Sequence, residues 1–416
     1  MNGRNQVIIN LFWKFMERGG VQVVTFIVQI VLARLLSPSD YGITSIITVF
    51  INIATVFIQS GLGSALIQKM DPDEEDYSTV FYINITIAIL LIVILYFVSP
   101  WIADFYEMPV LTPVLRACSW SLLFNAFWHV HIAILQKNLE FKKLFYANLG
   151  AALVSGTVGV AAALCGYGVW ALVIQQLLNS LVSTVIIWIL VPWRPKRIFS
   201  FKSFQELFGF GSKLLVSNLL DTIYENLQPL IIGKFFTQSD LGYYNQGRQI
   251  PNVLVNNLNR SIQGVMFPVF SENQQNPVRL KQLVRRSIVT SCFLVFPMMA
   301  GLAAVAKPAI VILLTEKWLP SVPYMQISCI VFAMWPIHTA NLQAINAMGR
   351  SDIFLKLEVI KKVLGVLMLV IAIPFGIMAI LWGTVFTGIL GTFINAWPNR
   401  RLLTYSYMEQ IRDILP

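Results

Sequence analysis

The sequence is poor in charge. Only 12% of its 416 residues are charged and 56% are hydrophobic, whereas soluble globular proteins carry about 25% charge. An ordinary soluble domain is therefore excluded. The chain also lacks a Gly-x-x-x-x-Gly-Lys-Ser/Thr phosphate loop and a His-Glu-x-x-His zinc motif. We therefore expect neither an enzyme nor a bound cofactor or metal.

Cysteine and histidine are scarce. His129 and His131 are two residues apart and so point to different faces of a helix, and His338 stands alone. A shared metal site is not expected. No Cys-x-x-Cys pair occurs, and the cysteines fall in or at the ends of apolar runs, which predicts small buried hydrophobic residues. The four are Cys118, Cys165, Cys292 and Cys329.

Long apolar runs are what the chain has in abundance. Each is long enough to cross the ~30 Å hydrocarbon core as a helix, and the ten-residue alternation of a membrane β-barrel is absent. The sequence therefore predicts an all-α integral membrane protein. We expect twelve transmembrane helices at 7–33, 41–67, 78–99, 111–136, 144–166, 168–191, 209–236, 241–270, 283–306, 320–347, 354–375 and 377–399.

Positive charge is concentrated in alternate loops. The basic residues of 137–143, 194–202, 279–286, 350–356 and 400–401 fall on one side of the predicted membrane. By the positive-inside rule both chain termini lie in the cytoplasm. The net charge of +10 therefore reflects topology and not a nucleic-acid partner. The acidic segment 71–77 lies on the same side and is expected to be a solvated loop.

The basic segment 193–208 divides the chain into two halves of six spans. We expect an N-lobe at 1–192, a cytoplasmic linker at 193–208, a C-lobe at 209–400 and a cytoplasmic tail at 401–416. Because each half has an even number of spans, both halves start on the same side. The repeats are therefore parallel, and a ligand belongs in the cleft between them.

One motif occurs in both halves. LARLLSPSDYG (Leu32 to Gly42) and IIGKFFTQSDLG (Ile231 to Gly242) align at an offset of 200. We expect a helix-to-helix corner used twice, with Ser39 and Ser239 as N-caps and an aspartate in each first turn.

Polar residues form helical stripes on the same two spans of each half. They follow steps of three and four, which place them on one face. An ionised side chain at bilayer depth costs roughly 3 kcal/mol and normally faces a bundle interior or a wet cavity. The alternative is that these amides hold helices together. The stripes are Lys14, Arg18, Gln22, Thr25, Gln29; Ser45, Thr48, Asn52, Thr55, Gln59; Asn218, Asp221, Glu225, Gln228; and Arg248, Asn252, Asn256, Asn259, Arg260, Gln263.

The arginines make the predicted cavity cationic. A guanidinium fork matches phosphate oxygens and stays charged, which favours an anionic substrate group. Asp221 and Glu225, one turn apart, either balance these charges or take up a coupling ion. Arg34 and Lys234 lie at the predicted outer mouth, where they meet emerging substrate or anchor the helices by snorkelling.

Four segments together resemble a known family. LARLLSPSDYG, GLGSALIQK from Gly61, LGYYNQGRQIP from Leu241 and VMFPVFSENQQNPVRLKQ from Val265 are similar to the polysaccharide-transporter branch of the MOP superfamily. The likeness is greatest to Wzx-type lipopolysaccharide flippases and spans nearly the whole chain.

The resemblance implies a carrier with two six-helix lobes in a V around a cationic cavity. Such a carrier moves undecaprenyl-diphosphate-linked oligosaccharide across the bacterial inner membrane by alternating access. It implies a monomer, with a polysaccharide polymerase and a chain-length regulator as possible partners. At matching positions the cavity residues are Arg18, Asp221, Glu225, Arg248 and Arg260, while the second span has only Asn52 and its polar neighbours. With Asn252, Arg34 and Lys234 these form the predicted site.

Two other functions stay open. A cation-coupled multidrug exporter belongs to the same superfamily, but an arginine-rich cavity disfavours cationic cargo. A membrane glycan polymerase or ligase needs acidic or histidine residues on a substantial outer loop, and the predicted outer loops are short.

Overall fold

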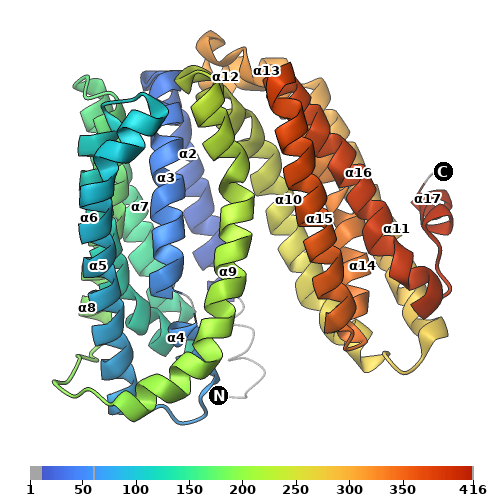
Figure 1. Ribbon diagram of the computed structural model, residues 1–416, viewed down its shortest axis with the longest axis horizontal. Helices are drawn as coiled ribbons and strands as arrows, with labels where there is room; N and C mark the ends of the chain where they lie inside the picture. Colours follow the sequence, from blue (N-terminus) through green and yellow to red (C-terminus); the bar gives the residue numbers. More distant parts are fainter. Residues whose placement is uncertain (1–11, 60, 415–416) are drawn as a thin grey trace. The chain divides into compact units, whose positions relative to one another are not determined.

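The computed structural model describes residues 12–59 and 61–414, apart from the side chains of Arg18 and Phe210. Every regular element in this part is a helix (Figure 1), which confirms the predicted all-α fold. Seven helical segments there are long and apolar enough to span a membrane. The chain is a multi-pass membrane protein and forms two compact units, one ending at Gly242 and the other beginning at Tyr243.

The first unit contains most of the apolar helices. Its elements are η1 (Met16–Gly20), α2 (Val21–Leu35), α3 (Pro38–Gln59), α4 (Leu62–Gln68), α5 (Glu74–Tyr106), α6 (Leu111–Lys137), α7 (Phe141–Leu164), α8 (Val169–Leu190) and α9 (Phe201–Phe235).

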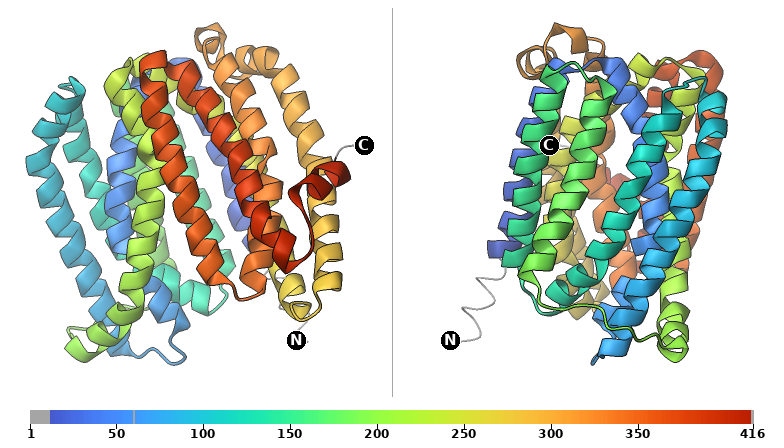
Figure 2. Two further views of the ribbon diagram at one scale, coloured as in Figure 1. Left: turned by 45° about the vertical axis from the view of Figure 1, so that its right-hand side comes forward. Right: turned by 90° about the vertical axis from the view of Figure 1, so that its left-hand side faces the viewer.

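Neighbouring helices in the first unit are mostly sequential. α5 lies along α6, and α7 lies along both α8 and α2 (Figures 1 and 2). α3 contacts both α6 and α9, so it is covered on one side by apolar packing. Ile46, Ile47 and Ile58 of α3 are almost completely buried.

The span predicted at 41–67 corresponds to one apolar segment long enough to cross a membrane, Pro38–Gln68, but its helix is interrupted. It breaks into α3 and α4 at Gly61, whose φ of +91° is one that side-chain-bearing residues rarely adopt. Gly61 also packs against Gly211 of α9, where a Cβ on Gly211 would lie 2.9 Å from the carbonyl carbon of Gly61. Hydropathy runs through this break because Leu62 and Leu66 beyond it are buried.

The second unit holds the remaining helices, together with the part of α10 from Tyr243 onward. They are α10 (Gln238–Glu272), α11 (Pro277–Ala304), α12 (Ala306–Leu314), η2 (Glu316–Trp318), α13 (Ser321–Ala333), α14 (Trp335–Ala347), α15 (Ser351–Ala372), η3 (Ile373–Phe375), α16 (Ile377–Leu402) and α17 (Tyr407–Ile414).

α11, α13, α14 and α16 pack together in the second unit, with α15 along α16. The span predicted at 320–347 is also broken, because Pro336 interrupts the helical hydrogen bonds between α13 and α14. α17, within the predicted tail, packs on α11 and α16. Its fully buried Gln410 exchanges hydrogen bonds with Asn341 of 2.9 and 3.1 Å.

The structure also tests the predictions made for the cysteines and for the linker at 193–208. Cys118, Cys292 and Cys329 are buried as expected, but Cys165 is exposed because it caps the end of α7 at a turn. Within 193–208, the later residues are helical, since α9 begins at Phe201 with Ser200 as its N-cap. The predicted lobe boundary there stays a prediction.

Candidate functional site

The two copies of the repeated motif have the same local geometry. A serine or threonine directly precedes each helix. Its backbone N–H and its hydroxyl donate hydrogen bonds to an aspartate three residues later. Ser37 Oγ lies 2.6 Å from Asp40 Oδ2, and Thr237 Oγ1 lies 2.6 Å from Asp240 Oδ2. The aspartate N–H returns a 3.2 Å bond in both cases, which is the reciprocal pattern of a capping box.

The prediction of Ser39 and Ser239 as N-caps is therefore wrong by two residues. α3 begins at Pro38 and α10 at Gln238, so both serines lie inside the helix. The prediction that each aspartate lies in the first turn is confirmed. Both helices begin earlier because Ser37 and Thr237, two residues before the predicted caps, form the capping hydrogen bonds.

The starts of α3 and α10 cross each other at two glycines. A Cβ on Gly42 would overlap the carbonyl oxygen of Gln238, and a Cβ on Gly242 would overlap that of Pro38. Ser39 Oγ also donates a 2.6 Å hydrogen bond to Gln238 Oε1. The repeated motif thus encodes two equivalent helix starts and the close contact between them.

The polar face of α3 is turned away from its packed face. Ser45 and Thr48 are half-buried and donate to the carbonyls of Tyr41 and Thr44, at 2.6 and 2.8 Å. Asn52 is exposed and makes no hydrogen bond within the described part of the chain. It lies fourteen residues after Pro38, about 21 Å along the helix. Asn52 is thus accessible at membrane depth.

α9, the neighbour of α3, places its acidic residues on an exposed face. Asp221 and Glu225 are both exposed and are one helical turn apart. Asn226, the residue after Glu225, is half-buried and donates to the carbonyl of Thr222 at 2.8 Å. The first unit therefore carries exposed polar residues on two adjacent helices.

The two cations at the helix ends differ. Lys234 at the end of α9 donates to the carbonyl oxygen of Phe105 at 2.6 Å and pairs with Glu107 at 3.2 Å. These contacts anchor the end of α9 to the end of α5. Arg34 at the end of α2 is exposed, whereas Lys234 is half-buried, so the two residues are equivalent in sequence but differ in burial.

In the second unit, the stripe of α10 is partly buried. Arg248 lies over the rings of Tyr244 and Phe332, 5.1 and 5.9 Å from their centroids, and donates to the Tyr244 hydroxyl. It lies ten residues after Gln238, about 15 Å along the helix, which is half the ~30 Å hydrocarbon core. The aromatic rings hold a charged group at that depth.

The other predicted residues of α10 lie further along the helix. The Asn252 side-chain oxygen accepts a hydrogen bond from the amide of Asn256. Arg260 is exposed and lies twenty-two residues after Gln238, about 33 Å along the helix. At that distance it reaches the far edge of the hydrocarbon core, where a snorkelling arginine is also stable.

The first predicted stripe is described only in part. The side chain of Arg18 and residues 7–11 of the first span lie outside the described residues. The backbone around Arg18 forms a π-helical turn from Met16 to Gly20, and such turns often mark functional sites. Lys14 pairs with Glu17 at 3.1 Å.

The acidic segment 71–77 is not a simple solvated loop, and sequence analysis missed its role. Asp76 is fully buried and pairs with Lys69 at 2.8 Å. Lys69 also pairs with Glu206 of α9 at 3.3 Å. Asp73 and Asp76 form a capping box at the start of α5, and the acidic residues three apart before an apolar run were the available signal.

Two of the three histidines, His131 and His338, form hydrogen bonds within the protein. His131 Nδ1 lies 3.1 Å from the carbonyl oxygen of Phe127, and His338 Nδ1 lies 2.9 Å from the Asn395 amide. Among the described residues, no group of three or more His, Cys, Asp or Glu could hold a metal ion.

Several known proteins are similar to this chain in sequence. The model of a family described as "Polysaccharide biosynthesis protein" matches residues 31–323. The chain is 29% identical to the teichuronic acid biosynthesis protein TuaB of Bacillus subtilis, over 72% of this chain and 62% of TuaB. It is 24% identical to the lipopolysaccharide biosynthesis protein WzxC of Escherichia coli, over 92% of this chain and 79% of WzxC.

The fold has also been seen before. An inward closed structure of the lipid II flippase MurJ superposes with a TM-score of 0.78 at 15% identity, covering 98% of this chain and 90% of that one. The chain spans less than two thirds of the length of TuaB. The predicted likeness to polysaccharide biosynthesis proteins is confirmed, and the chain belongs to the polysaccharide biosynthesis protein family.

Proposed function

We propose that this protein is a flippase that carries undecaprenyl-diphosphate-linked oligosaccharide across the bacterial inner membrane for surface polysaccharide synthesis. It works by alternating access, without covalent chemistry on the substrate, and with both termini in the cytoplasm. The observation that carries the proposal is the set of exposed polar positions on two adjacent helices, Asn52 on α3 and Asp221 and Glu225 on α9. A membrane helix presents such residues to water or polar cargo.

Each predicted residue has a role in this proposal. Arg248 offers a charged, forked hydrogen-bond donor to a phosphate group. The rings of Tyr244 and Phe332 already hold its guanidinium by cation–π contacts, so the side chain loses less conformational freedom on binding. Asn52 and Asn252 offer neutral amide groups to sugar hydroxyls. Asp221 and Glu225 balance the positive charge or bind a coupling ion. Arg18, Arg34, Lys234 and Arg260 contribute positive potential along the path.

Export of surface glycan tests the proposal. Deletion of the gene in the source bacterium should abolish the surface polysaccharide and leave lipid-linked oligosaccharide on the cytoplasmic leaflet. A plasmid with the wild-type gene should restore export. A multidrug exporter would instead give drug sensitivity with normal glycan. A polymerase would leave unpolymerised units that have already reached the outer leaflet.

Arg248→Ala tests the proposed role of a single site residue most directly. Loss of a charge-assisted hydrogen bond is worth about 1.5–3 kcal/mol, so we expect export to fall at least about tenfold at normal membrane abundance. Arg286→Ala is the matched control, because Arg286 is exposed near the start of α11 and outside the polar stripes. Export at the wild-type level by stably expressed Arg248→Ala would remove this residue from the mechanism.

A further inference from the structure

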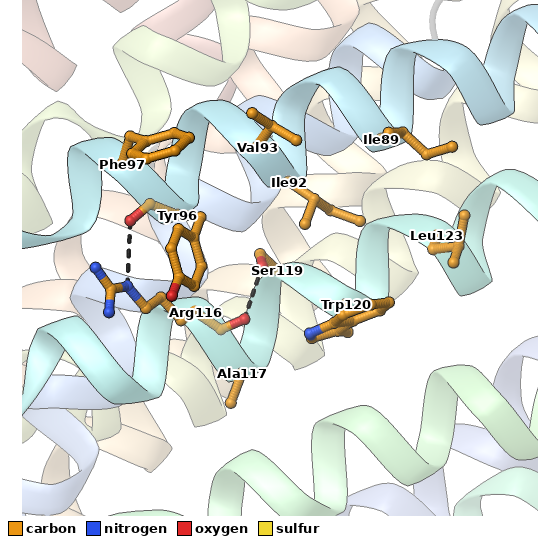
Figure 3. A pocket seen from close by; sticks show the side chains of 10 residues that line it. All are labelled: Ile89, Ile92, Val93, Tyr96, Phe97, Arg116, Ala117, Ser119, Trp120 and Leu123. Atoms are coloured by element: carbon orange, nitrogen blue, oxygen red, sulfur yellow. Dashed lines mark hydrogen bonds between the residues drawn. The ribbon is translucent and has the colours of Figure 1, made fainter.

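A groove runs between α5 and α6 (Figure 3). Its volume is about 470 Å³, within the range of ~300–1,000 Å³ typical of small-molecule sites. Ile89, Val93 and Phe97 line it from α5, and Trp120 and Leu123 line it from α6. Both helices are among those apolar enough to span a membrane.

The groove opens on the surface of the first unit. Ile89, Val93, Phe97 and Trp120 are 51%, 46%, 69% and 54% exposed. From Ile89 to Phe97 the helix rises about 12 Å, close to one leaflet of a hydrocarbon core that is ~30 Å thick. The groove therefore has the length and surface of a site for one lipid chain.

Arg116 supplies a positive charge at one end of this apolar groove. It lies five residues after the start of α6 at Leu111, about 7.5 Å along the helix. This places its guanidinium near the edge of the hydrocarbon core, at the level where lipid phosphates begin. An isolated cation on a lipid-facing surface is costly unless an anion meets it.

The guanidinium is held in place from one side only. Its Nε donates to the Tyr96 carbonyl oxygen at 3.1 Å and to Ser99 Oγ at 3.0 Å. That carbonyl lacks its helical partner because Pro100, four residues later, has no N–H. The Cζ atom also lies 4.0 Å from the centroid of the Tyr96 ring. These contacts fix the plane of the guanidinium but use only one of its three nitrogens.

The two terminal nitrogens of Arg116 are available. Within the described part of the chain they donate no hydrogen bond, and neither is a buried atom lacking a partner. A fixed guanidinium with two outward nitrogens matches two oxygens of a phosphate. The capping of a proline-interrupted helix explains the Nε contacts but not this outward orientation.

We propose that the α5–α6 groove binds one chain of an anionic phospholipid and that Nη1 and Nη2 of Arg116 hold its phosphate. A single guanidinium balances one phosphate charge, whereas a diphosphate would leave charge unpaired. The groove is also far shorter than an undecaprenyl chain, while it matches an acyl chain within one leaflet. This site is independent of the proposed flippase function.

Lipid titration of the purified protein tests the site. Native mass spectrometry and thermal unfolding are measured with phosphatidylglycerol and with phosphatidylcholine of identical chains. Wild type should retain phosphatidylglycerol and gain thermal stability from it, and should respond much less to phosphatidylcholine. Arg116→Gln should weaken phosphatidylglycerol binding at least about tenfold, as expected for a charge-assisted contact.

A second variant leaves Arg116 and its helix contacts untouched. Val93→Trp fills the groove and should remove one bound phosphatidylglycerol together with the stabilisation it gives. Val154→Trp is the matched control, because Val154 is equally exposed (46%) on α7 and should bind lipid as wild type does. Unchanged phosphatidylglycerol binding by Val93→Trp would overturn the proposal.

The remaining outcomes show which molecule occupies the α5–α6 groove. Equal binding of both phospholipids would overturn the role of Arg116 as an anion clamp. Displacement of phosphatidylglycerol by undecaprenyl phosphate at equimolar concentration would assign the groove to the isoprenoid instead. Dimers of wild type that Val93→Trp abolishes would assign it to a second copy of the chain.

Discussion

At the scale of single residues, the buried carboxylate of Asp76 gives the clearest energetic prediction. Asp76 is fully buried, its partner Lys69 is 28% exposed, and their side chains meet at 2.8 Å. Lys69→Met would leave the carboxylate buried without its cation, which costs several kcal/mol for a fully buried pair. Because Lys69 is partly exposed, we expect about 2 kcal/mol and a lower melting temperature in detergent.

A matched control variant and the pH dependence of stability test the same prediction. Lys143→Met breaks an exposed pair with Glu140 and should change stability by less than about 0.5 kcal/mol. The hydrogen bond to Asp76 raises the pKa of Lys69. Its stabilisation is therefore complete below the unfolded pKa of ~10.4 and is lost only as pH rises through the higher folded value. Equal melting temperatures for Lys69→Met and wild type at pH 7 would contradict this account.

At the scale of helices, the crossing of α3 and α10 depends on two glycines. A methyl group at Gly42 or Gly242 would overlap a backbone carbonyl oxygen that cannot rotate away. Gly42→Ala and Gly242→Ala should therefore separate the two helix starts, lower the melting temperature and reduce glycan export. Gly264→Ala in α10 has open space around its Cβ and should stabilise that helix by up to about 1 kcal/mol. Opposite signs for these variants are the expected result, and equal effects would refute the close crossing.

The sequence predicts helices well and their interruptions poorly. Hydropathy locates α6, α7 and α8 to within about three residues, because nearly every residue there faces lipid or apolar packing. It ends α5 too early, since the predicted span stops at 99 and the helix continues to Tyr106. It misses the breaks at Gly61 and before Pro336, since apolar residues continue on both sides. The striping of α9 and α10 predicts which helices carry polar faces. The contacts of Arg116 and Lys234 with α5 and of Lys69 with Glu206 of α9 join residues at least seventeen positions apart, and no local pattern reports such pairing.

At the scale of the whole molecule, the duplicated corner is the fixed point of the alternating access that we propose. Both of its helix starts lie in the first compact unit, while α10 continues from Gly242 into the second. Any rotation of one unit against the other must therefore bend α10 or open the contact between Ser39 and Gln238. Glycine-lined contacts are close-packed and resist opening, so we expect the corner to stay closed throughout transport.

A disulfide across the corner tests this expectation. The Ser39 hydroxyl donates to the Gln238 side chain, so the two side chains face each other, and we expect the pair Ser39→Cys and Gln238→Cys to cross-link on oxidation. If the corner is the fixed point, the oxidised double variant should export glycan at the level of its reduced form. The single variants control for the loss of each side chain. Export that stops on oxidation and returns with reductant would mean that the corner opens during transport, and the pivot would then have to lie further along α10, where Pro251 and Pro268 interrupt its hydrogen bonds.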